Sequence, residues 1–165
     1  GGGLFVYDGD FSLENVSLEG KDRILKSGTG DLKVPAACAA LPAVRVRSGA
    51  LDAQDGVATA YTVNGALRID GGATLKVDLV NGVCDSFAVT ALDVSAASTG
   101  NRVFIDIPAS VGYERVSGSH LLVSGAGLSE SDAAKFKTVG MKGSFSVKNG
   151  DLYLDPPKGL FIVVQ

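Results

Sequence analysis

Apolar and polar residues alternate over many short stretches of the chain, and the clearest of these lies between Gly65 and Leu79. A period of two predicts strands that bury one face in a core and expose the other to solvent. Gly71-Gly72 divides the stretch and predicts a turn. The region therefore predicts a strand, a turn and a second strand. Its apolar face consists of Leu67, Ile69, Leu75, Val77 and Leu79, and its polar face of Arg68, Asp70, Thr74, Lys76 and Asp78.

Related units recur along the sequence, with Gly-containing turns such as Asn64-Gly65 and Asn81-Gly82 between them. Their spacing of roughly 8–12 residues is typical of an all-β sandwich, barrel or solenoid. Because one such unit cannot bury its face alone, repetition favours a solenoid of stacked strands, with a β-sandwich as the alternative. Further strands are expected at residues 4–7, 11–13, 16–18, 23–26, 32–34, 44–47, 50–53, 61–63, 83–89, 91–94, 103–107, 121–123, 143–147, 151–154 and 160–164.

Two segments depart from the strand pattern. Pro35–Pro42 carries two prolines, which disfavour a regular ladder, so a loop or one helical turn over an open end or edge is expected there. One short helix is expected near residues 129–137, because Ser129 can cap it and Asp132 follows three residues later, as in a capping box.

Composition narrows the class of protein. The 165 residues suit one β-rich domain spanning 1–165, and hydrophobic residues at 45% exclude a disordered chain. The net charge is −3 without a basic cluster, so no nucleic-acid partner is expected. No apolar run approaches the ~18 residues of a membrane span.

Cys38 and Cys84 leave two interpretations open. They form a disulfide in an oxidising compartment, or they are separate buried thiols, and their spacing does not decide. With a single histidine, His120, a structural zinc site is not expected.

No catalytic pattern emerges. No Gly-x-Ser-x-Gly motif surrounds a serine, so His120 is interpreted as a turn or strand-edge residue. Asp8-Gly9-Asp10 lacks the rest of a calcium-binding loop. The sequence thus predicts no enzyme, metal or cofactor. The aspartates weighed as paired carboxylates fall in turns or on polar strand faces, where solvation explains them; they are Asp8, Asp10, Asp52, Asp55, Asp70, Asp78, Asp93 and Asp106.

Leu25–Val34 resembles the autotransporter-associated β-strand repeat, and Gly65–Leu79 resembles later rungs of such passenger segments. The C-terminal region, from the helix at Leu128–Phe136 onward, is similar to passenger-type ends. The resemblance implies a right-handed parallel β-helix in a bacterial surface or secreted protein, of which this chain is a fragment or terminal section. The family shares no catalytic residues, so none is transferred.

The first functional hypothesis is a non-catalytic structural or adhesive extracellular module that self-assembles through terminal strands, because exposed strand edges invite pairing. The alternatives are a glycan-binding module, a fragment of a β-helical polysaccharide-processing enzyme, and a fibre or surface-layer subunit. For glycan binding, Arg45, Arg47 and Arg68 are candidates on one polar face, although a solvated face also explains them. The expected assembly strands consist of Leu4, Phe5, Val6 and Tyr7, and of Leu160, Phe161, Ile162, Val163 and Val164.

Overall fold

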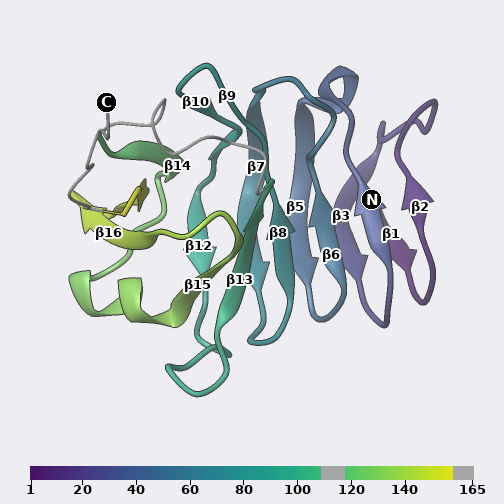
Figure 1. The fold of residues 1–165 in the computed structure, drawn as a ribbon. Coiled ribbons are helices and arrows are strands. Elements are labelled where there is room, and N and C mark those ends of the chain that lie inside the picture. The colour runs from purple at the N-terminus through teal and green to yellow at the C-terminus, as the bar shows by residue number, and fades with distance from the viewer. Residues whose placement is uncertain (109–117, 158–165) are drawn as a thin grey trace.

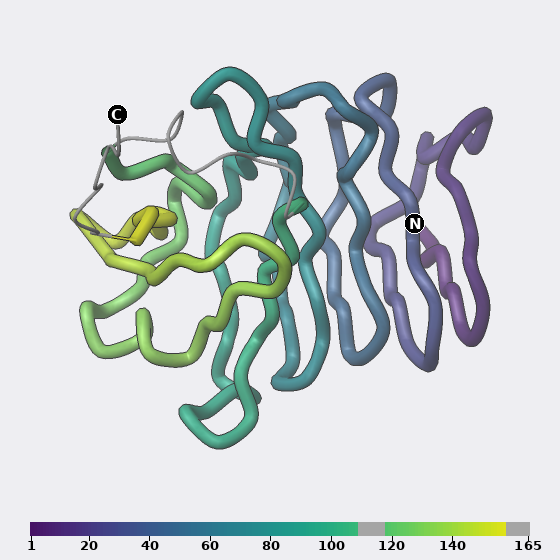
Figure 2. Tube along the Cα trace, viewed as in Figure 1, coloured from purple at the N-terminus to yellow at the C-terminus, as the bar shows by residue number. Residues whose placement is uncertain are grey.

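The computed structural model describes residues 1–108 and 118–157. It is a β-solenoid of about four turns, in which successive coils lie side by side and contribute parallel strands to two sheets (Figures 1 and 2). At the C-terminal end of one sheet, the strands His120–Ser124, Asp151–Asp155 and Ser144–Lys148 pair antiparallel instead. The predicted stack of short parallel strands is confirmed. The β-sandwich alternative is not observed, because such sandwiches are built from antiparallel sheets.

Sheet A contains nine strands and sheet B contains six. The order in sheet A is β1 (Gly2–Val6), β3 (Lys21–Lys26), β5 (Ala40–Val46), β7 (Ala60–Ile69), β11 (Ser86–Ala88), β14 (His120–Ser124), β17 (Asp151–Asp155) and β16 (Ser144–Lys148), with β12 (Ala91–Asp93) also paired to β7. The order in sheet B is β15 (Phe136–Gly140), β13 (Val103–Ile107), β8 (Thr74–Lys76), β6 (Ala50–Asp52), β4 (Asp31–Lys33) and β2 (Phe11–Ser12). A separate hairpin pairs β9 (Leu79–Val80) with β10 (Val83–Cys84).

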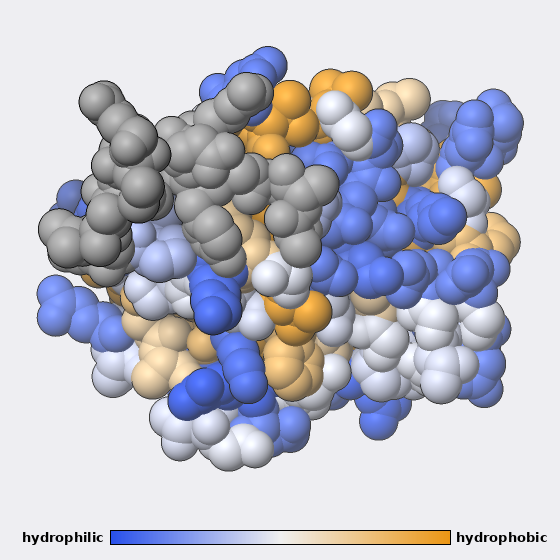
Figure 3. Space-filling model, in the orientation of Figure 1, coloured by the Kyte–Doolittle hydropathy of each residue, from blue (hydrophilic) through white to orange (hydrophobic). Residues whose placement is uncertain are grey.

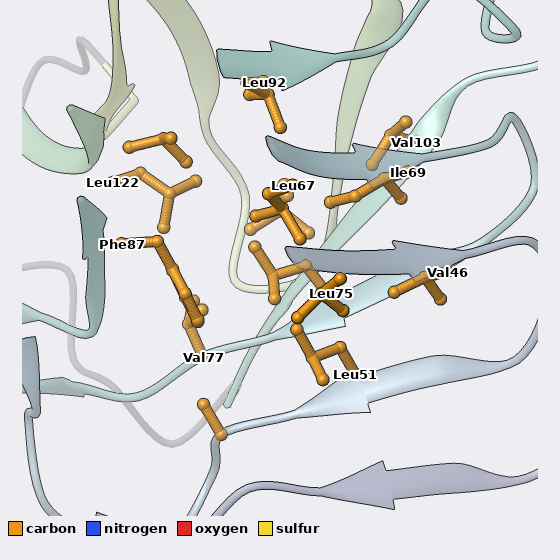
Figure 4. Packing of buried hydrophobic residues seen from close by; sticks show 14 of the residues in the cluster. Val46, Leu51, Leu67, Ile69, Leu75, Val77, Phe87, Leu92, Val103 and Leu122 are labelled. Carbon is orange, nitrogen blue, oxygen red and sulfur yellow. The ribbon is translucent and has the colours of Figure 1, made fainter. Parts of the chain in front are cut away.

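The core lies between the two sheets, where apolar side chains of successive coils stack on one another (Figure 4). Paired residues of in-register parallel strands point the same way, so one apolar position per coil builds a continuous row. Outward positions alternate with these rows and make the surface largely hydrophilic over the N-terminal coils (Figure 3). The row from sheet A is Ile24, Val44, Leu67 and Leu92, and the row from sheet B is Leu32, Leu51, Leu75 and Ile105.

The two strands predicted on either side of Gly71-Gly72 lie in different sheets, since β7 belongs to sheet A and β8 to sheet B. Gly72 has a φ of +86°, which side chains rarely adopt. A Cβ added to Gly71 would lie 2.4 Å from the carbonyl oxygen of Asn101. The glycine pair therefore turns the chain from one sheet to the other against the loop of the next coil.

The turn predicted at Asn64-Gly65 is wrong, and so is the second half of the loop predicted at Pro35–Pro42. Asn64-Gly65 lies inside β7, where the register with β5 shifts between Pro42 and Val44. The extra residue is accommodated as a bulge, so the strand continues through it. Pro42 belongs to β5, although two prolines were expected to prevent a ladder. It is tolerated because β5 pairs with β3 only from Ala43 onward.

The predicted helical turn in the first half of Pro35–Pro42 is present as the 3₁₀ helix η1 (Ala36–Cys38). The helix expected near 129–137 is also a 3₁₀ helix, η3 (Glu130–Lys135), and is shorter than predicted. Its start follows the prediction, because the Asp132 carboxylate accepts the backbone N–H of Ser129 at 2.9 Å.

Residues 16–18 do not form the expected strand. The N–H of Val16 donates to the carbonyl of Leu13, and the N–H of Lys21 donates to that of Leu18. These local bonds bend the chain, while Val16 and Leu18 still pack against the core. The alternation in this segment therefore identified two residues that pack against the core, but it did not identify a strand.

Lys26 is a buried polar residue that occupies an inward position, between Val6 and Val46 of the neighbouring coils. Its ammonium group donates to three carbonyl oxygens at the turns of the first two coils. These oxygens belong to Tyr7 at 3.0 Å, Ser27 at 2.9 Å and Thr29 at 2.7 Å. The hydrogen bonds compensate for the burial of the charged group.

Candidate functional site

Three arginines lie on the outer face of sheet A, and a fourth directly follows one of its strands. Arg45 of β5 pairs in register with Arg68 of β7, and Arg23 of β3 pairs with Ala43. Arg47 follows the end of β5 two residues beyond Arg45. Neighbouring strands of a sheet are about 4.8 Å apart, so this arrangement gathers guanidinium groups from three successive coils.

A shallow groove of about 410 Å³ lies among Arg23, Arg45 and Arg68. Ala43 and Ala66 line the groove with small side chains. The two strands approach each other closely here, since a Cβ added to Gly65 would lie 2.8 Å from the Cβ of Ala43. Small residues at these positions leave room between the long side chains. We call this surface the arginine groove; it is lined by Phe5, Arg23, Ile24, Leu25, Ala43, Val44, Arg45, Ala66 and Arg68.

Two carboxylates hold part of the arginine groove in place. Asp70 accepts from Arg45 Nη2 at 2.9 Å and from Arg68 Nε at 3.1 Å. Asp93 lies 3.7 Å from Arg68 Nη1. Partial burial raises the pKa of Asp70, but the hydrogen bonds from the two arginines outweigh this and lower the pKa below its usual value. Arg45 and Arg68 are thereby oriented side by side.

The remaining two arginines have no carboxylate partner among residues 1–108 and 118–157. The guanidinium of Arg23 lies over the ring of Phe5, 5.7 Å from its centroid. Phe5 is 46% exposed, and Tyr7, which directly follows β1, is 64% exposed. The sequence did not predict this contact, because alternation places Phe5 in a strand without identifying the residue of the next coil that lies beside it.

The outer face of sheet B carries charges of alternating sign. Lys33, Asp52, Lys76 and Asp106 are in-register neighbours, and Lys76 Nζ lies 2.7 Å from Asp31 Oδ2. Burial raises the pKa of Asp52. Lys76 lies between Asp52 and Asp106 in the sheet. The two carboxylates are therefore neighbours of a lysine and do not form the carboxylate pair that was considered from the sequence.

Other aspartates connect neighbouring coils through backbone amides, which the sequence-based interpretation as solvated residues did not anticipate. Asp8 accepts from Thr29 N–H and Asp10 accepts from Asp31 N–H, both at 2.9 Å. Asp55 accepts from Ala36 N–H at 3.1 Å. Within the described part of the chain, no three His, Cys, Asp or Glu residues are placed to share a metal ion.

Cys38 and Cys84 are free thiols on different coils. The Cys38 thiol lies 3.4 Å from the carbonyl oxygen of Leu13. Burial, together with the nearby carboxylates of Asp85 and Asp78, raises the pKa of Cys84 to about 12, so this thiol is a poor nucleophile at neutral pH.

His120 lies on β14, and its Nε2 is buried without a hydrogen-bond partner in the described structure. The neighbouring Ser119 hydroxyl donates to Asp155 instead of to the histidine. The geometry therefore provides no nucleophile–base pair at this position.

The first predicted assembly segment, Leu4–Tyr7, overlaps β1, which is the terminal strand of sheet A. The second, Leu160–Val164, lies outside the described residues. Phe11 of β2 occupies the first position of the inward row that Leu32 continues, yet it is 40% exposed. The coil formed by β1 and β2 thus carries several exposed apolar side chains.

Among the described residues, no helix is long and apolar enough to cross a membrane. Comparisons with protein-family models, with curated proteins and with solved structures find no match for the chain. The fold and the geometry of its surface are therefore the basis for assigning a function.

Proposed function

We propose that the protein is a non-catalytic adhesive module of a bacterial surface or secreted protein, and that the arginine groove binds an acidic glycan. The observation that carries the proposal is that Arg23, Arg45 and Arg68, from three successive coils, line one groove on the outer face of sheet A together with the small residues Ala43 and Ala66. Arginine suits this role because its planar fork matches a carboxylate or sulfate group.

The charge balance supports an anionic ligand. Asp70 and Asp93 compensate Arg45 and Arg68, whereas Arg23 and Arg47 have no carboxylate partner in the described structure. Each exposed ion pair contributes little on its own. A linear polymer lying across the strands meets an arginine-bearing coil about every 4.8 Å, so several weak contacts act together.

Aromatic side chains add a second type of contact. Phe5 lines the arginine groove and has an exposed ring, and Tyr7, two residues further along the chain, is also exposed. An exposed ring can pack against the apolar face of a sugar while the arginines bind its acidic groups. A ligand that combines both features is an acidic polysaccharide.

The test is binding of polygalacturonate, with neutral dextran as the comparison, measured by calorimetry at low and physiological salt. We expect Arg23→Ala to weaken binding several-fold, because it removes a guanidinium group that lines the groove and breaks no ion pair within the described residues. Lys33→Ala removes the same charge from sheet B and serves as the matched control. Equal binding of dextran, or an equal loss in Lys33→Ala, would contradict the proposal.

Self-association is a second candidate, favoured by the exposed Phe11 at the terminal coil and by the unpaired edges of β1 and β2. Sedimentation analysis should then detect oligomers that Phe11→Asp dissociates. Val139→Asp places the same charge at another exposed apolar residue, 43% exposed, and should leave them intact. A monomer at all concentrations argues against this candidate.

A further inference from the structure

A second and smaller pocket lies on the other sheet, at the outer face of β13 and β15. Its volume is about 170 Å³, and its lining residues belong to β13, to β15 and to the loop before β13. Phe104 of β13 pairs in register with Lys137 of β15, so both side chains project from the same face. Arg102 directly precedes β13. The lining residues are Thr99, Gly100, Arg102, Phe104 and Lys137.

The loop that carries Thr99 and Gly100 is fixed by its own hydrogen bonds. Ser98 and Asn101 exchange backbone bonds at 3.0 and 3.2 Å, which closes the loop into a tight turn. The carbonyl of Arg102 accepts the N–H of Gly72 at 2.8 Å, which ties the loop to the preceding coil. The pocket is therefore formed before any ligand arrives.

The two cations of the pocket lack compensation. Arg102 Nε is buried and has no hydrogen-bond partner in the described structure. Neither Arg102 nor Lys137 has a carboxylate partner among residues 1–108 and 118–157, in contrast to Arg45 and Arg68. Asp106, two residues beyond Phe104, does not line the pocket. A buried donor without an acceptor is unfavourable, so this arrangement favours a ligand that supplies one.

We propose that this pocket binds a tetrahedral oxyanion group, the sulfate or phosphate of a monoester. The Arg102 fork can donate two hydrogen bonds to such a group, while Lys137 contributes a point charge. Thr99 and Gly100 add hydroxyl and amide donors to the lining. The volume of about 170 Å³ equals roughly six water molecules, at about 30 Å³ each, which accommodates one such group.

Phe104 completes the chemistry of the pocket. Its ring forms an apolar wall beside the two cations, against which the organic part of an ester can pack. The pocket opens on sheet B, whereas the arginine groove lies on sheet A, so the two sites involve different residues. The proposal does not depend on glycan binding by the arginine groove.

The test is a titration of the isotope-labelled chain with inorganic sulfate and with inorganic phosphate, followed by the amide resonances of Thr99 and Gly100. We expect saturable shifts at these amides, and at least a tenfold loss of affinity in Arg102→Gln and in Lys137→Gln. Lys33→Gln removes a cation from the same sheet outside the pocket and should bind as the parent does. Preserved amide spectra will show that each variant is folded.

Galactose 6-sulfate and galactose 6-phosphate distinguish the two sources of the oxyanion. Tighter binding of either ester than of its inorganic ion supports the pocket and identifies the ester that it takes. The absence of saturable shifts at Thr99 and Gly100 with all four compounds would overturn the proposal. An equal loss of affinity in Lys33→Gln would also overturn it, because the binding would then reflect overall charge.

Discussion

Asp85 and Asp78 bind each other's main chain reciprocally. The N–H of Asp85 donates to the carbonyl of Asp78 at 2.9 Å, and the N–H of Asp78 donates to Asp85 Oδ2 at 2.7 Å. Asp85 Oδ1 also accepts from Thr59 at 2.7 Å, and Asp78 Oδ2 accepts from Asp55 and Gly56. These carboxylates connect the crossing segments of neighbouring coils, and Asp85 does so while fully buried.

This burial makes stability depend on pH. Desolvation, aided by repulsion from Asp78 and Asp55, outweighs the two amide bonds and raises the pKa of Asp85 to about 6, from an ordinary value of 3.8. Between these values the folded state binds the proton more tightly than the unfolded state. The contribution of Asp85 to the free energy of unfolding therefore falls as pH rises from about 4 to 6 and is constant above.

Asp85→Asn should remove this slope, which urea unfolding at pH 4.5, 5.5 and 7 measures. At pH 7 the free energy of unfolding should change little, because two effects oppose each other. An amide offers only one oxygen to the two N–H donors, which costs roughly 1–3 kcal/mol, but it also removes the buried charge whose cost is reflected in the raised pKa of Asp85. Asp70, whose pKa is lowered, contributes in the opposite direction and only at lower pH. A variant with the slope of the parent protein would show that another group titrates.

Tyr61 and Phe87 stack inside the solenoid on successive coils. Their ring centroids lie 5.0 Å apart at an interplanar angle of 11°, and the Tyr61 hydroxyl donates to the carbonyl of Val34 at 2.8 Å. Tyr61→Phe keeps the stack and removes only the hydrogen bond, so unfolding should require about 1 kcal/mol less. Tyr7→Phe, at an exposed ring, should change stability by less than about 0.5 kcal/mol. Equal effects would mean that the buried bond adds nothing.

Lys26 is a charged residue at a buried, inward position, and its hydrogen bonds lead to a prediction about stability. Lys26→Met preserves the buried stem but leaves the carbonyls of Tyr7, Ser27 and Thr29 without their shared donor. We expect a loss of roughly 1–3 kcal/mol in urea unfolding. Lys33→Met, at an exposed position, is the control. Unchanged or increased stability of Lys26→Met would indicate that burial of the ammonium group costs as much as its bonds return.

The alternation of apolar and polar residues predicted the fold correctly where only apolar side chains fit, between the two sheets. Leu67, Ile69 and Leu75 are buried as their alternation requires, because only apolar side chains fill the space between the sheets. Asn64-Gly65 misled the prediction, since the same pair that favours a hairpin turn also fits a bulge within a strand. Which one forms depends on the neighbouring coil, and local sequence does not describe it.

The candidate sites were less accessible to prediction than the fold. Arg45 and Arg68 were assigned to one polar face, but the shared carboxylate of Asp70 depends on the registration of two coils. Arg102 and Lys137 are far apart in sequence and meet only because β13 and β15 pair. A charged residue at an outward position can lie beside many different residues. The alternation along a strand therefore predicts the face of the sheet on which it lies, but not the residues that it contacts.

Substitution of Asp70 tests how the charge of the arginine groove affects its affinity for an acidic glycan. The Asp70 carboxylate neutralises Arg45 and Arg68, which an acidic glycan would otherwise engage. Asp70→Asn keeps an acceptor oxygen and removes the negative charge. An exposed ion pair of this kind contributes about 0.2–1 kcal/mol, so polygalacturonate should bind about 1.5–5-fold more tightly to this variant at low salt.

Salt distinguishes this electrostatic effect from a change in structure. The gain should shrink at physiological ionic strength, where the screening length is about 8 Å. Asp22→Asn removes an exposed carboxylate outside the groove lining and should change the affinity less than Asp70→Asn. Weaker binding of Asp70→Asn would mean that the carboxylate serves the ligand by holding the two guanidinium groups in position, and the arginine groove would then depend on orientation more than on net charge.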